Sequence, residues 1–262
     1  MNRNIFKSVT VLFVLLIITS CNKTTKTISK IDSEIIITMK ESSSKRLQLR
    51  FSTAKIYPCC NYPIDLSYKK RSNTIDIALK NVIETEFCLT ALGPATADIE
   101  LKALSIGTYI LNLNIGNSKY AGELIVSSGN YRINFADNPN YRFTNTPLNK
   151  LPKNTIWGYV GYHVQESSLL VEAFLDDLMG LGAEKKKYNP GYYTYFEIDE
   201  NGEITYGDAL LGYWFAQPFI FCYSGKIDNI EELIKQYARN YNDKLSITLN
   251  TDDGKEFFSY RY

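Results

Sequence analysis

The sequence predicts two folded units, an all-β sandwich over residues 33–136 and an α+β domain over residues 155–262. Apolar residues recur at every second position in the first stretch, whereas in the second they also recur at the helical spacings of three and four. Between the two, residues 137–154 contain three prolines and many asparagines, a composition that is typical of a linker.

The first unit repeats the strand pattern from segment to segment. The apolar residues that share a face are Leu47, Leu49 and Phe51; Ile64, Leu66 and Tyr68; Ile75, Ile77 and Leu79; Tyr109, Leu111, Leu113 and Ile115; and Tyr131, Ile133 and Phe135. Such alternation indicates half-buried antiparallel strands. About eight short strands separated by turn residues, with no helical stripe, predict a β-sandwich or a barrel.

Residues 104–113, LSIGTYILNL, narrow this choice. They resemble the L-x-x-G-x-Y-x-L pattern found before a late strand in immunoglobulin-like and fibronectin-type modules. In such modules the tyrosine lies at a corner and its hydroxyl bonds the backbone upstream. The resemblance implies an immunoglobulin-like sandwich, in which Tyr109 has a structural role and Gly107 permits the turn.

The second unit mixes strands and helices. Its predicted elements are strands at 155–164 and 218–224, helices at 167–183 and 228–241, and hairpins that turn at Asn201-Gly202 and Asp253-Gly254. The order is β-α-β-β-α-β with extra hairpin strands, the order of ferredoxin-like, split βαβ folds. We expect both helices to pack on one face of an antiparallel sheet.

The N-terminus predicts export and a lipid anchor. Residues 1–20 combine a basic start with an apolar run too short to cross a bilayer, which is typical of a signal peptide. Ile18-Thr19-Ser20-Cys21 then resembles the lipobox of bacterial lipoproteins. The resemblance implies cleavage before Cys21 and lipidation of that residue by palmitate-type acyl chains, of which two or more anchor a protein firmly. Residues 21–32 would be the lipid-anchored tether.

The residues after Cys21 bear on localisation. In enteric lipoproteins an Asp at this place retains the protein at the inner membrane, so Asn22 favours the outer membrane. Lineages that export lipoproteins to the cell surface use early acidic residues, whereas here three lysines precede the first acid, Asp32. The resemblance therefore implies an outer-membrane, lipid-anchored protein that faces the periplasm rather than the surface.

Charge and cysteines set further limits. Without Arg3 and Lys7 the 29 basic residues become 27 against 28 acids, a net charge of −1 that gives no argument for nucleic-acid binding. Export permits disulfides among the four remaining cysteines, Cys59, Cys60, Cys88 and Cys222. Adjacent cysteines rarely bond each other, so we expect Cys59 or Cys60 to pair with Cys88; the alternative is buried thiols. The spacing does not suit zinc, and we expect no metal or other cofactor.

The sequence contains no recognisable catalytic motif. The only histidine, His163, has no nucleophile at a recognisable elbow, and we expect it to be structural or exposed. Four carboxylates, Glu197, Asp199, Glu200 and Glu203, could serve glycoside hydrolysis or bind Ca²⁺. Because they flank the Asn201-Gly202 turn, solvation of the turn is the favoured interpretation.

Aromatic residues are dense between 188 and 223. Tyr193, Tyr195, Tyr213 and Trp214 are candidate ligand-binding residues, since such rings combine flat apolar area with a polar tip. The favoured alternative is that the rings fill a core. The leading hypothesis is a non-enzymatic binding or assembly module with a glycan or an envelope protein as partner. The rivals are an envelope hydrolase, a carbohydrate- or peptide-binding protein that uses residues 188–223, and a purely structural spacer.

Overall fold

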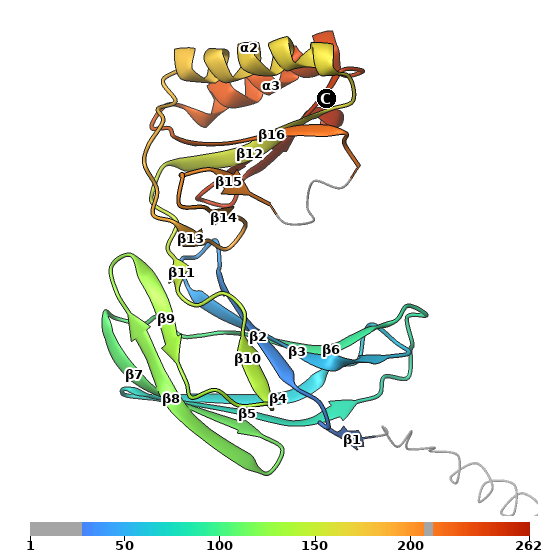
Figure 1. Cartoon of the computed structure of the whole chain (residues 1–262), viewed down its shortest axis with the longest axis vertical. Helices are drawn as coiled ribbons and strands as arrows, with labels where there is room; N and C mark the ends of the chain where they lie inside the picture. Colours follow the sequence, from blue (N-terminus) through green and yellow to red (C-terminus); the bar gives the residue numbers. More distant parts are fainter. Residues whose placement is uncertain (1–27, 207–211) are drawn as a thin grey trace, which may run out of the picture.

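A computed structural model describes residues 28–206 and 212–262, which form two units stacked end to end (Figure 1). The lower unit consists of two facing β-sheets, and the upper unit carries two helices on one face of a third sheet. The predicted signal peptide, Cys21 and most of the predicted tether lie outside the described residues.

The lower unit is built from two sheets. The larger has the order β1-β5-β7-β8-β9-β11-β13-β14-β15, with β4 beside β5, and the smaller has the order β10-β2-β3-β6. The strands of the larger sheet are β1 (Ile28–Lys30), β4 (Ile64–Arg71), β5 (Thr74–Ile83), β7 (Gly107–Ile115), β8 (Ser118–Val126), β9 (Asn130–Asn134), β11 (Leu148–Asn149), β13 (Gly191–Tyr192), β14 (Glu197–Ile198) and β15 (Ile204–Thr205). Those of the smaller are β2 (Ile35–Glu41), β3 (Leu47–Tyr57), β6 (Gly93–Glu100) and β10 (Tyr141–Phe143).

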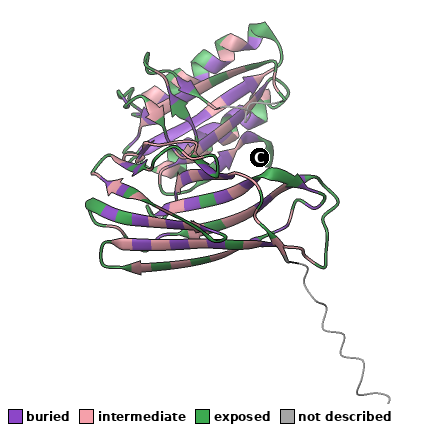
Figure 2. Ribbon diagram, turned by 60° about the horizontal axis from the view of Figure 1, so that its bottom comes forward, coloured by how far each residue is buried: buried purple, intermediate pink, exposed green. Residues whose placement is uncertain are grey.

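One apolar core holds the two sheets together. Alternate residues of β2, β3, β5 and β7 are buried in it, and Figure 2 shows the same alternation of buried and accessible positions along these strands. Phe51, Ile75 and Leu113, each expected on a buried face, are almost fully enclosed. The predicted β-sheet architecture of this unit is confirmed.

Not every strand pair is antiparallel. The prediction of antiparallel pairing is wrong for β5 with β7 and for β2 with β10, which are parallel. Because β6 lies between β5 and β7 in the chain and belongs to the opposite sheet, the chain returns to the larger sheet in its original direction. A strand alternation in sequence identifies the buried face but not the neighbour.

The predicted linker belongs to the sandwich. Within residues 137–154, β10 pairs with β2 and β11 pairs with β9, and both Tyr141 and Leu148 are buried in the core. The prolines and asparagines do mark turns, but the short apolar segments between them add strands to both sheets. Likewise β1, at the end of the predicted tether 21–32, pairs with β5.

The upper unit has a four-stranded antiparallel sheet with the order β16-β12-β17-β18. Its elements are β12 (Thr155–Tyr162), η1 (Gln165–Ser167), α2 (Ser168–Gly180), β16 (Phe215–Cys222), α3 (Ile227–Tyr241), β17 (Leu245–Thr251), β18 (Glu256–Phe258) and η3 (Ser259–Arg261). As expected, both helices lie on one face, where Phe174 and Ile234 pack against Val160 and Phe219 of the sheet. Among the described residues, no helix has the length and apolar character needed to cross a bilayer.

The hairpin at Asn201-Gly202 joins the other unit. Its strands β14 and β15 were expected in the upper sheet, but they pair through β13 with β11 of the sandwich. Each of these strands has only two residues, too few for their side chains to specify a partner. The upper sheet instead gains only an isolated antiparallel bridge, between Glu184 and Cys222.

Candidate ligand-binding site

The aromatic segment 188–206 covers the second face of the upper sheet. Even-numbered residues of β12, such as Ile156 and Val160, face the helices, whereas Trp157 faces away from them into a separate cluster. That cluster contains Tyr188, Tyr193, Phe196, Ile198 and Ile204, all buried. The upper sheet is therefore covered on both faces, by the two helices and by this extension of the sandwich sheet, and the density of aromatic residues reflects this double cover.

Two of the four candidate aromatic residues belong to this covering layer. Tyr193 is buried and its hydroxyl donates to the Asn189 carbonyl at 3.1 Å. Tyr195 is partly exposed but stacks on the Trp157 indole, with ring centroids 5.2 Å apart. Tyr193 therefore belongs to the core, whereas Tyr195 is 52% exposed and packs on the core with one face of its ring.

The other two candidates lie at the far end of β12. Tyr213 covers Gly161, where an added Cβ would come within 2.5 Å of the ring, and its hydroxyl bonds the Ser246 hydroxyl at 2.7 Å. Trp214 is 82% exposed. The structure thus does not bring the four predicted residues together, and Trp214 alone among them presents its ring fully to solvent.

His163 and the four carboxylates do not lie together in a catalytic arrangement. His163 is exposed just after β12, with its ring 5.6 Å from that of Tyr213. Asp199 accepts the Glu203 backbone N–H at 2.8 Å, a bond that lowers the pKa of this carboxyl and closes the hairpin turn. Glu197, Glu200 and Glu203 are exposed on the same hairpin, as turn solvation predicts.

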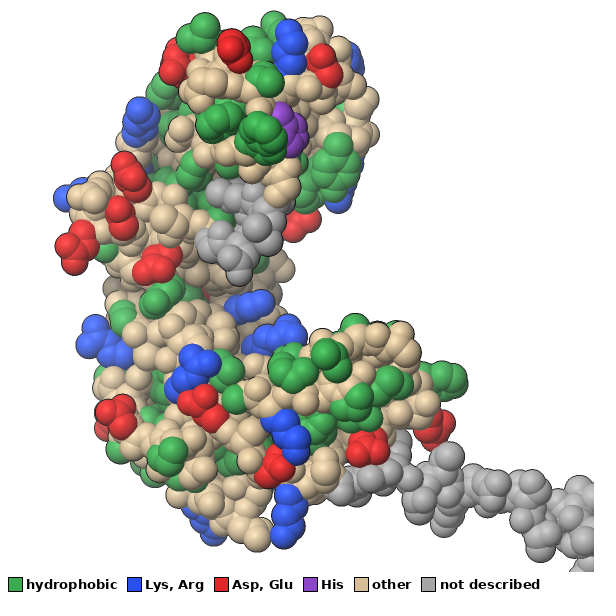
Figure 3. Space-filling model, turned by 45° about the vertical axis from the view of Figure 1, so that its right-hand side comes forward, with side chains coloured by type: hydrophobic (Ala, Val, Ile, Leu, Met, Phe, Trp, Pro, Cys, Tyr) green, Lys and Arg blue, Asp and Glu red, His purple; other side chains and the backbone are tan. Residues whose placement is uncertain are grey.

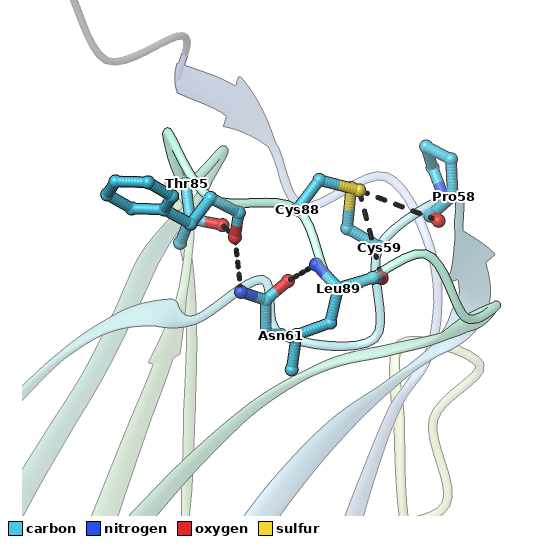
Figure 4. The surroundings of a disulfide bond; sticks show 7 residues. Pro58, Cys59, Asn61, Thr85, Cys88 and Leu89 are labelled. Carbon is cyan, nitrogen blue, oxygen red and sulfur yellow. Dashed lines mark hydrogen bonds between the residues drawn. A yellow bond between two sulfur atoms is a disulfide. The ribbon is translucent and has the colours of Figure 1, made fainter.

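Cys59 forms a disulfide with Cys88, with the two Cα atoms 5.2 Å apart (Figure 4). Cys59 is buried, whereas its neighbour Cys60 is an exposed free thiol, and Cys222 is half-buried and free. Cys59 follows the end of β3, whereas Lys45 at the junction precedes its start, so the disulfide stands apart from the aromatic residues.

The junction between the units is tightly connected. The Glu41 backbone N–H donates to the Thr194 hydroxyl at 2.6 Å, and the Glu41 carboxylate accepts the Leu151 N–H at 3.2 Å. Asn149 donates to the Pro190 carbonyl at 3.1 Å. These contacts, with the β11–β13 pair, fix segments from both units around a common space.

That space is a cavity of about 500 Å³ that the sequence did not predict. Five lysines line it, namely Lys45, Lys150, Lys153, Lys186 and Lys187, together with Tyr131, Tyr188, Tyr193 and Asn189. Glu41 is the only acid in the lining. Figure 3 shows blue side chains gathered at the waist between the two units. The volume of the cavity falls within the range of ligand pockets.

Burial tunes the charges inside this cavity. Burial lowers the pKa of Lys150, whose ammonium donates to the Ser127 carbonyl at 2.6 Å and lies 4.5 Å from the centre of the Tyr131 ring. Burial also raises the pKa of Glu41, and the Lys45 ammonium is 3.9 Å from its carboxylate. A positive excess in a partly enclosed site favours an anionic guest.

The sequence contained only a weak signal of this site. Lys186 and Lys187 belong to a run of three lysines after α2, and such runs are usually solvated faces. Lys150 and Lys153 fell in the predicted linker, and Lys45 in a hairpin turn. Only the fold brings these three segments together.

Among residues 28–206 and 212–262, no group of three or more His, Cys, Asp or Glu side chains is placed so that it could hold a metal ion. The chain matches no protein-family model, no curated protein and no solved structure. The arrangement of its own residues therefore carries the functional argument.

Proposed function

We propose that this chain is a lipid-anchored envelope protein that binds an acidic saccharide, without catalysis, in the lysine-lined cavity at the junction of its two units. The carrying observation is the cavity itself, in which five lysines and three tyrosines surround a space of ligand size with a single acid. Lysines attract carboxylate or phosphate groups. The three tyrosines are buried and form part of the cavity wall, so the lysines carry the proposal, and the acidic saccharide is the charged form of the glycan partner expected from the sequence.

The anchor part of the proposal rests on the sequence at residues 18–21. Its lipobox-like pattern supports acylation of Cys21, with the outer membrane and a periplasmic orientation as the proposed location. The compartment suits the disulfide between Cys59 and Cys88, because such bonds persist in oxidising environments.

We also propose finer fold assignments. The upper unit is a ferredoxin-like, split βαβ domain whose second strand is reduced to the Glu184–Cys222 bridge: β12 has β17 on one side and β16 on the other, and the bridge lies on the far edge of β16. For the sandwich, the immunoglobulin-like proposal is supported by the Tyr109 hydroxyl, which donates to the Ser105 carbonyl at 3.0 Å. The parallel β5–β7 pair is a departure from that fold.

The binding proposal is tested by calorimetric titration with oligogalacturonate and with its methyl-esterified counterpart, which keeps the sugar rings but loses the charge. We expect binding of the acidic form only, weakened by salt. The double variant Lys186→Gln with Lys187→Gln removes two positive charges from the cavity. An attraction between one such charge and a ligand carboxylate about 4 Å away contributes about 1 kcal/mol to the binding free energy, so we expect the affinity to fall roughly tenfold or more.

Two matched variants sharpen this test. Lys119→Gln removes an exposed charge from the sandwich and should leave the affinity unchanged. Glu41→Gln keeps an acceptor for the Leu151 N–H but removes the acid from the cavity, so affinity should rise. Equal affinity for the esterified saccharide, or equal effects of Lys119→Gln and the double variant, would refute an anionic site at the junction.

A further inference from the structure

A second feature of the molecule is an exposed apolar end of the sandwich. In the loop between β5 and β6, Phe87 is 85% exposed and Leu92 is 78% exposed, and Leu89 and the nearby Ile56 are also exposed. We call these four side chains the apolar tip. Figure 3 shows hydrophobic side chains gathered along the projecting arm of the lower unit. Large apolar groups exposed together usually mark a contact surface.

The loop that carries the apolar tip is braced. The Cys59–Cys88 disulfide ties it to the end of β3, and the Asn61 side chain fixes the backbone on both sides of Cys88 (Figure 4). The Asn61 amide donates to the Phe87 carbonyl at 2.6 Å, and its oxygen accepts the Leu89 N–H at 3.2 Å. The apolar side chains are thus held outward on a fixed backbone.

The apolar tip lies where the N-terminal segment enters the fold. Ile28, the first residue of β1, pairs with Ile83, and the loop begins at the next residue. Cys21 is seven residues before Ile28. A fully extended chain of that length spans at most about 25 Å. An acyl group on Cys21 would therefore keep the bilayer surface close to this end of the sandwich.

The charges of the loop identify the kind of contact. Residues 84–92 contain Glu84 and Glu86 but no lysine or arginine. Attraction to anionic headgroups therefore cannot drive contact of this loop with a lipid surface. Such a contact would be driven by burial of apolar surface.

We propose that the apolar tip inserts into the interfacial layer of the bilayer that holds the anchor. This inference rests on the lipid anchor of the proposed function. The sandwich then meets the membrane at two places, the acylated N-terminus and the braced loop. Two contacts fix the tilt of the molecule. Because β1 and the upper unit lie at opposite ends of the structure (Figure 1), the upper unit stands away from the bilayer.

Cys60 provides a probe, because its free thiol is exposed beside the disulfide. The full lipidated chain with Cys222→Ser is labelled at Cys60 with an environment-sensitive dye and reconstituted in phosphatidylethanolamine–phosphatidylglycerol vesicles. We expect the protein to float with the vesicles and the dye to be quenched by lipids brominated on their acyl chains, in low and high salt alike. A dye on Asn201→Cys, with Cys60 also replaced, should not be quenched.

Variants locate the contact. Phe87→Ser with Leu92→Ser should reduce quenching of the Cys60 dye to the level of the Asn201 site while flotation persists. Leu169→Ser, at a similarly exposed position on α2, should leave quenching unchanged. Because these side chains are exposed, the substitutions preserve the fold, which circular dichroism checks.

Each other outcome overturns the inference. Flotation with an unquenched dye at Cys60 refutes membrane contact and leaves the anchor standing. A spectral shift without quenching by brominated lipid means that a second protein copy covers the apolar tip. Failure to float, with no acyl mass on Cys21, removes the anchor and the inference together.

Discussion

Two regions of this chain are rich in large apolar side chains, and they end in opposite environments. The aromatic segment 188–206 is mostly buried, because it covers the face of the upper sheet that the helices leave open. The apolar tip, in contrast, is exposed, with Phe87 at 85%. A high density of aromatic residues in a sequence therefore does not by itself reveal a binding surface, because the number of layers packed over a strand decides whether its rings are buried.

The largest expected effect is at the covered face. Trp157→Ala removes the indole that packs against Tyr195 and Phe196, and large-to-small substitutions of this kind cost about 3–5 kcal/mol. We expect a loss of that size in the free energy of unfolding, measured with urea. A loss below about 1 kcal/mol would show that the aromatic layer does not pack on the sheet, and it would revive the hypothesis that this segment binds a ligand.

The next effect concerns the brace of the apolar tip. Replacing both partners, Cys59→Ser with Cys88→Ser, releases a loop whose ends are 29 residues apart and should cost about 3.5 kcal/mol in the chain-entropy model. Cys60→Ser, at the adjacent free thiol, is the matched control and should leave the free energy of unfolding within about 0.5 kcal/mol of the parent. Equal losses for both variants would point to a different pairing.

A smaller effect, dependent on pH, is expected at the junction between the sandwich and the upper unit. Burial raises the pKa of Glu41 above its ordinary value, so the folded state holds this proton more tightly than the unfolded chain. The stability that Glu41 contributes is present below its ordinary pKa and is lost as pH rises through the raised value. Glu41→Gln should therefore gain stability relative to the parent between mildly acidic and neutral pH. A constant difference across that range would contradict the assignment.

The smallest effect is expected at Trp214. Its ring is 82% exposed, so Trp214→Ala should change the free energy of unfolding by less than about 0.5 kcal/mol. Trp157→Ala, the same substitution at a buried ring of the same unit, is the variant with which its free energy of unfolding is compared. If the two variants lost similar stability, the contrast between the covered and exposed rings would be wrong.

Sequence patterns predicted the elements better than their neighbours. Alternation located the strands of the sandwich because one face of each strand is buried, as at Ile75 and Leu113. The pattern could not choose between Cys59 and Cys60 as the partner of Cys88, because the alternation of β3 is interrupted at the exposed residues 54–56 before Tyr57. It could not predict that β14 would join the sandwich, because pairing of two-residue strands depends on the whole fold.

The candidate site was hidden for a related reason. Lys45, Lys150 and Lys187 are separated by long stretches of chain and meet only where the two units join. The exposure of Phe87 and Leu92 could not be predicted from the sequence either, because it depends on how the chain folds around them. Trp214, by contrast, was predicted as a candidate and is exposed, although Tyr193 and Tyr195 lie elsewhere.

The mass of the N-terminal peptide, measured on the protein purified from bacterial membranes, shows directly whether the chain is cleaved and acylated at Cys21. We expect this peptide to begin at Cys21 and to carry the added mass of acyl chains, and we expect Cys21→Ala to abolish metabolic labelling with palmitate. A peptide that begins elsewhere, or an unmodified Cys21, would contradict both the anchor and the membrane contact of the apolar tip.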